Sequence, residues 1–175
     1  MANTYTLIAS NTLSSSAASV TFSSIPSTYT DLVVKISARS AYSGGNLDYF
    51  EWTFNGLTTS IYSGTFLYYL PTSVGSNRFS SGTKSTTNAM FPASTATSNT
   101  FSSTEIYIPS YTASQNKPYS LFTVAENNSS TDYGIDIDAN LIRTTSAISS
   151  MTFTGAFGSN FVSGSSFFLY GIKSS

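Results

Sequence analysis

Apolar and polar side chains alternate with a period of two along most of the chain, which is the pattern of β-strands with one buried face. In residues 31–39, for example, Leu32, Val34 and Ile36 share one face, and polar residues such as Lys35 and Ser37 occupy much of the other. We expect about eight to ten strands, within residues 5–9, 18–22, 31–39, 49–54, 104–108, 120–125, 133–141, 149–153 and 167–172.

Turn signals separate these strands. Residues 49–54 place Phe50, Trp52 and Phe54 on one face, and Asn55-Gly56 then predicts a type I′ turn because both residues tolerate positive φ. Nearer the start of the chain, residues 5–9 and 18–22 predict a first hairpin.

No segment has the spacing of an amphipathic helix, so any helix is one short turn, expected near residues 61–70. The fold class is therefore all-β with little or no helix. Eight or more strands in 175 residues favour a single domain, 1–175, built as an antiparallel β-sandwich of the jelly-roll type. Residues 71–100 are rich in Ser, Thr, Gly and Asn and predict a long polar loop, of a length that usually serves a function.

The composition excludes several function classes. Only 9% of residues are charged and the net charge is −1, so the chain lacks the basic surface that binds nucleic acid. The absence of His and Cys excludes disulfides, zinc sites with nitrogen or sulfur ligands and the Ser-His-Asp triad. Solubility depends instead on 36 Ser, 25 Thr and 12 Asn. We expect no enzyme activity, no cofactor, no membrane span and no signal peptide.

Two acidic residues are the main candidates for chemistry. Asp136 and Asp138 are two positions apart and share one face of the strand predicted at 133–141, opposite Ile135 and Ile137. The simplest interpretation is a solvated outer face. The pair could also bind calcium, with Asp132 or Asn140 adding an oxygen, or act as the two carboxylates of a glycosidase.

Three aromatic residues are candidates for stacking on a sugar ring. Trp52 lies beside acidic residues, and Tyr68 and Tyr69 are adjacent in the sequence. Packing in a core explains Trp52 at least as well, because it follows the alternation of its strand.

Several sequence segments resemble a family of small virion proteins of tailed bacteriophages, of the cyanophage type. The segments are TYTLIAS near the start, SIPSTYTDLVVKISARS at 24–40, FNG at 54–56, EIYIPSY at 105–111, NKP at 116–118, AENN at 125–128 and the closing FFLYGI. The resemblance spans most of the chain and implies a structural protein, either of the capsid or of a tail or fibre. The polar stretch 71–100 departs from the family pattern.

A single short domain without a shaft repeat favours a capsid decoration, or cement, protein. Such a protein would be made in the host cytoplasm, bind the major capsid protein on the outer surface of the virion as a homo-oligomer, with a trimer expected, and stabilise the expanded shell. The segment from Met1 to Ser10 or the stretch 71–100 would make the contact, with Tyr5, Leu7, Met90 and Phe91 as candidates. The alternative is a fibre module that recognises host polysaccharide through Trp52, Tyr68 and Tyr69.

Overall fold

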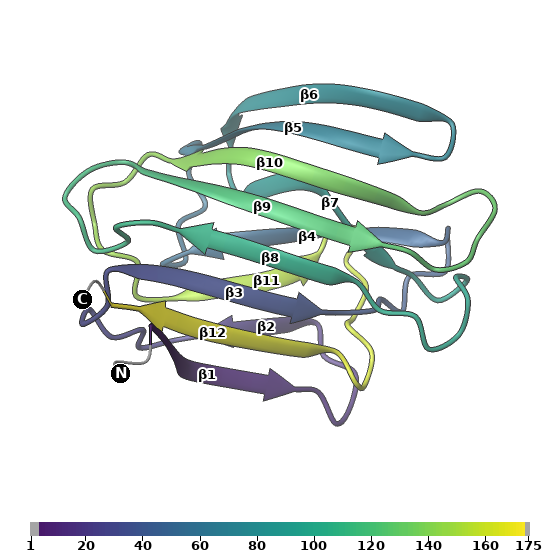
Figure 1. Ribbon diagram of the computed structural model, residues 1–175, viewed down its shortest axis with the longest axis horizontal. Helices are drawn as coiled ribbons and strands as arrows, with labels where there is room; N and C mark the ends of the chain where they lie inside the picture. The colour runs from purple at the N-terminus through teal and green to yellow at the C-terminus, as the bar shows by residue number, and fades with distance from the viewer. Residues whose placement is uncertain (1–3, 174–175) are drawn as a thin grey trace.

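Strands from distant parts of the sequence pair to form two antiparallel sheets, shown in Figure 1. The computed structural model describes residues 4–173, and within this range twelve strands form a sheet of eight, in the order β1-β12-β3-β8-β9-β10-β5-β6, and a sheet of four, in the order β2-β11-β4-β7. The bounds are β1 Tyr5–Thr12, β2 Ser19–Phe22, β3 Asp31–Ser37, β4 Leu47–Phe54, β5 Tyr62–Leu70, β6 Ser73–Gly82, β7 Ser85–Pro92, β8 Ser103–Ile108, β9 Lys117–Ala125, β10 Gly134–Ile142, β11 Met151–Gly155 and β12 Ser166–Ile172.

Eight of the strands have the connectivity of a jelly roll. The strands β1, β12, β3 and β8 are neighbours in the large sheet, and β2, β11, β4 and β7 form the small sheet. Along the chain, these eight strands alternate between the two sheets, except that β4 and β7 follow each other within the small sheet, where they pair. This double-sheet arrangement is how a jelly roll closes an antiparallel fold. The predicted β-sandwich is confirmed, with more strands than the eight to ten expected.

Two inserted hairpins account for the wider sheet. One hairpin, β5–β6, lies between β4 and β7 in the sequence, and the other, β9–β10, lies between β8 and β11. Because β10 pairs with β5, the two hairpins together extend the large sheet beyond β8. The expected helical turn at 61–70 is wrong, because this segment is β5. The expected loop at 71–100 is also wrong over most of its length, because it contains β6 and β7.

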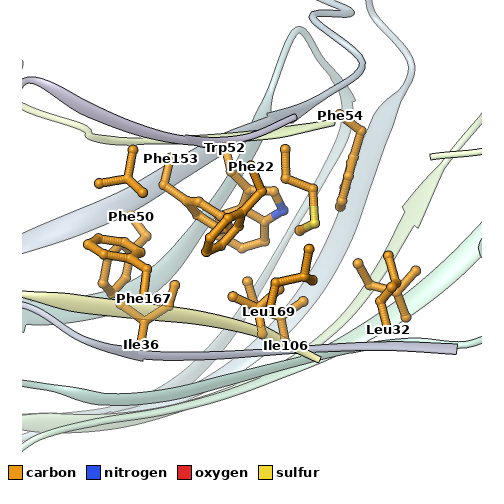
Figure 2. Packing of buried hydrophobic residues seen from close by; sticks show 14 of the residues in the cluster. Phe22, Leu32, Ile36, Phe50, Trp52, Phe54, Ile106, Phe153, Phe167 and Leu169 are labelled. Carbon is orange, nitrogen blue, oxygen red and sulfur yellow. The ribbon is translucent and has the colours of Figure 1, made fainter. Parts of the chain in front are cut away.

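Aromatic and aliphatic side chains from the two sheets meet in the core, shown in Figure 2. Phe50, Trp52 and Phe54 of β4 are at most 1% exposed and point toward the large sheet, as their alternation predicts. Leu32 and Ile36 of β3 face them from the other side. Each such side chain stabilises the fold by about 1.5–3 kcal/mol relative to an exposed position.

The turn after β4 has the predicted conformation, with φ of 53° at Asn55 and 65° at Gly56. The predicted hairpin between residues 5–9 and 18–22 is wrong. β1 pairs with β12 and β2 pairs with β11, in different sheets. This crossing between sheets is a property of the jelly roll that local alternation does not specify.

A buried arginine fixes the connection between β7 and β8. The Arg39 side chain donates hydrogen bonds to the backbone carbonyls of Ser94, Ala96, Thr97 and Thr100, at 2.7–3.2 Å. Burial lowers the pKa of this guanidinium. The connection is therefore held by a cation that satisfies four carbonyls at once.

Candidate functional site

Strand β1 carries two of the predicted contact residues at one edge of the large sheet. Tyr5 is 54% exposed and Leu7 is 51% exposed, and β1 pairs with β12 alone. A bulge between Leu7 and Ala9 shifts the register, so that Ala9 packs against the core while Tyr5 and Leu7 remain at the surface. Residues 1–3 of the predicted contact segment lie outside the described residues.

The other two contact candidates are in the interior. Met90 and Phe91 of β7 are 0% exposed. The Phe91 ring stacks on Phe50 with centroids 4.2 Å apart, and Met90 lies in a small buried cluster with Leu47. Their expected position on an exposed loop is therefore wrong, because this segment is a strand that covers the large sheet.

The three glycan-contact candidates are not brought together. Trp52 is 1% exposed and belongs to the core, so its ring offers no face to a ligand in this structure. Tyr69 is 43% exposed on the outer face of β5. Tyr68 is half-buried on the opposite face, where its hydroxyl lies against Gly75 of β6.

Six large apolar side chains lie exposed on the outer face of the sheet extension, and we call them the outer patch. Ile137 of β10 stands opposite Phe122 of β9 and Leu67 of β5, and Ile135 stands opposite Tyr69. The patch consists of Leu67, Tyr69, Val74, Phe122, Ile135 and Ile137, which are 41–79% exposed. An apolar patch of several residues at a protein surface often has a function such as binding.

The faces of β10 are the reverse of those expected from the sequence. Asp136 is 0% exposed and Asp138 is 2% exposed, so the expected solvated acidic face is wrong. The alternation of β10 is correct, but its aspartates point toward the interior and its isoleucines toward the surface. The isoleucines that were expected in the core therefore form the centre of the outer patch.

The two buried carboxyl groups share their environment. Both oxygens of Asp136 are buried beside the Asp138 carboxyl, whose Oδ2 accepts a hydrogen bond of 3.3 Å from Asn140 Nδ2. Burial, followed by the charge of Asp138, raises the pKa of Asp136 to about 9. Asp136 is therefore protonated at neutral pH and can donate a hydrogen bond to Asp138.

Calcium binding by Asp136 and Asp138 was only an alternative to the solvated face, and it stays a hypothesis. Asp132, the third candidate ligand, accepts hydrogen bonds from Asn46 and Thr131 in the connection between β9 and β10. Within residues 4–173, no three His, Cys, Asp or Glu side chains are arranged to hold a metal ion.

Four connections between strands form a pocket of about 260 Å³ that the sequence did not indicate. Phe157, between β11 and β12, is 51% exposed and stacks on Tyr42 at 4.4 Å between centroids. Asn46 Nδ2 donates to Asp132 Oδ2 at 3.0 Å on the polar side of the pocket. In the sequence, the local sign of this pocket was Ser43-Gly44-Gly45. A Cβ on Gly44 would collide with the Tyr42 ring.

No protein-family model matches the chain, and no curated protein matches it significantly. In the described part of the chain, no helix has the length and apolar character needed to span a membrane.

Proposed function

We propose that the protein is a non-enzymatic structural protein of a tailed-phage virion, and specifically a capsid decoration protein that binds the outer shell as a homo-oligomer and stabilises the expanded capsid. The sequence resemblance supports this class of particle. The observation that carries the binding role is the exposed edge strand β1, with Tyr5 and Leu7 more than half exposed.

An edge strand can hold a protein partner in two ways. The backbone groups of β1 on the side away from β12 are available to pair with a strand of the partner. Tyr5 and Leu7 add apolar contacts that fit shallow pockets, and aromatic side chains are common anchors in interfaces. The partner of this surface is the major capsid protein in its assembled, expanded form.

Stabilisation of the shell follows from mass action. A protein that binds the assembled shell, but not the free subunit, shifts the equilibrium toward the intact shell. An oligomer makes several such contacts at once, so that weak individual contacts give firm attachment. Electrostatic repulsion between copies of the chain does not oppose such an oligomer, because only 9% of the residues are charged and the net charge is −1.

The test uses shells of the phage that encodes the protein, stripped of it, and measures binding of the purified protein by co-sedimentation. Tyr5→Ser with Leu7→Ser is expected to abolish binding without unfolding the domain, because both side chains are exposed. The control is Ser19→Ala on β2, at an exposed position of the other sheet. Binding equal to wild type by the double variant would refute the role of β1. A count of a few copies per virion, confined to the tail, would refute a decoration protein.

The pocket formed by the four connections, which we call the loop pocket, favours a second candidate function, a fibre module that recognises host polysaccharide. Its exposed Phe157 ring offers a surface for stacking on a sugar, and the Asn46 and Asp132 side chains beside it can hydrogen-bond to hydroxyl groups. This pocket replaces the earlier candidate Trp52, which is buried. Retention on immobilised host polysaccharide that is lost in Phe157→Ala and kept in the β1 double variant would select this function.

A further inference from the structure

The outer patch is a continuous surface across four strands. Ile137 lies between Phe122 and Leu67 along one row of the sheet. In the next row, Tyr69 lies between Ile135 and Val74. Figure 1 shows these strands, β9, β10, β5 and β6, side by side at the end of the large sheet opposite to β1. The patch is thus separate from the proposed shell contact.

The size of the patch matches a protein interface. The six residues are 41–79% exposed, which amounts to on the order of several hundred Å² of apolar surface. A standard interface buries about 800 Å² on each partner, and its polar rim contributes part of that area. Polar residues such as Thr65 and Ser76 border the patch and supply such a rim.

The charges around the patch select the partner. On the outer face of these four strands, the charged residue is Arg78 of β6, opposite Thr65 near the margin. On the side of Phe122, the neighbouring charges are Lys35 and Glu105, which form an ion pair with each other. A surface with almost no net charge has no electrostatic preference for an acidic or basic partner, and it can meet an identical surface without repulsion.

We propose that the outer patch is covered by a second copy of this chain. Interfaces between identical subunits are more apolar than other interfaces and are depleted of charge in their core, as this patch is. A chain with a net charge of −1 has little charge to keep an exposed apolar surface of this size in solution, and closed self-association removes that surface from water. This inference deepens the proposed function, since it assigns the surface through which the homo-oligomer forms, and a patch that meets an identical patch gives a twofold dimer in place of the trimer expected from the sequence.

The first experiment measures the mass of the isolated protein in solution by light scattering coupled to size exclusion. The wild type is expected at a multiple of 18.7 kDa. The variant Ile137→Asp is expected at 18.7 kDa, because the oligomer would bury its carboxylates at the centre of the patch. Ser19→Asp, which adds the same group at an exposed position of β2, is expected to keep the wild-type mass. Circular dichroism checks that each variant is folded.

A second experiment does not depend on how Ile137→Asp folds. The chain has no cysteine, so Ile137→Cys and Ser19→Cys each introduce a single thiol whose rate of reaction with a maleimide can be measured. The thiol of Ile137→Cys is expected to react slowly at concentrations where the oligomer forms and fast on dilution. The thiol of Ser19→Cys is expected to react fast at both.

A wild-type protein that is monomeric at all concentrations would overturn the inference, and so would an oligomer in which the thiol of Ile137→Cys reacts as fast as that of Ser19→Cys. A patch that is protected only after purified shells are added would also overturn it, since the partner would then be the shell. Both experiments use the protein alone, so their failure is distinct from a failure to bind shells.

Discussion

The buried carboxyl of Asp136 makes the stability of the fold depend on pH in a defined direction. Its pKa is raised to about 9 by burial and by the charge of Asp138. Between about pH 4 and about pH 9 the folded state therefore holds a proton that the unfolded state has released. The stability that Asp136 contributes is fully present below the pKa of its carboxyl in the unfolded state, and it is lost as the pH rises toward the pKa of that carboxyl in the folded state.

The size of this pH dependence follows from the release of one proton on unfolding. Each pH unit in this window lowers the free energy of unfolding by up to about 1.4 kcal/mol, which amounts to about 4 kcal/mol from about pH 5 to about pH 8. The replacement Asp136→Asn keeps the shape of the side chain and removes the titration. The stability difference between Asp136→Asn and the wild type is therefore expected to grow by about 4 kcal/mol over this range in favour of the variant.

The assay is urea unfolding at several pH values, followed by the fluorescence of the single tryptophan, Trp52. The chain contains no histidine, so few other groups titrate in this window. Glu105→Gln, which neutralises an exposed carboxyl on β8, is the control and should keep the wild-type slope. Equal slopes for wild type and Asp136→Asn would refute the assignment of this pH dependence to Asp136.

Two further predictions concern stability. Trp52→Ala should lower the free energy of unfolding by about 3–5 kcal/mol in urea unfolding followed by circular dichroism, because it leaves a cavity between the sheets. Tyr5→Ala, at an exposed position outside the outer patch, should cost less than about 1 kcal/mol. Similar losses for the two variants would contradict the burial of Trp52. Arg39→Met should cost about 2–4 kcal/mol, since four carbonyls lose their charged donor, and should speed hydrogen exchange in residues 94–102. Unchanged exchange there would show that this connection is held by other contacts.

The sequence was sufficient where one face of a strand is apolar and the other polar. The alternation in β4 placed Trp52 correctly, and Asn55-Gly56 indicated the turn that follows. In β10, alternation identified the strand but not which face is buried, because Asp136 and Asp138 lie in the interior and Ile137 is exposed. A period of two defines two faces, and only the neighbouring strands determine which of them is inside.

Other features had no local signal. Strand β6 is exposed along most of its length, so its residues Ser73–Gly82 show no apolar period, and it exists because its backbone pairs with β5. The stretch 71–100 was expected to be a loop because it is rich in Ser, Thr, Gly and Asn. The loop pocket depends on four connections distant in sequence, and the outer patch depends on the pairing of β10 with β5, so neither could be assembled without the topology.

The position of β12 between β1 and β3 also constrains how the chain is made. The large sheet joins its first strand to the rest only through residues 166–172, which are synthesised after every other described strand. Until then β1 has no neighbour and one edge of β3 is open, which are conditions that slow folding and favour aggregation of nascent chains. Tyr5 pairs with Ile172, so the two ends of the described chain lie together. A circular permutant that joins them and opens the chain at the β5–β6 turn would synthesise β12 and β1 in succession, and it should fold faster than the natural order.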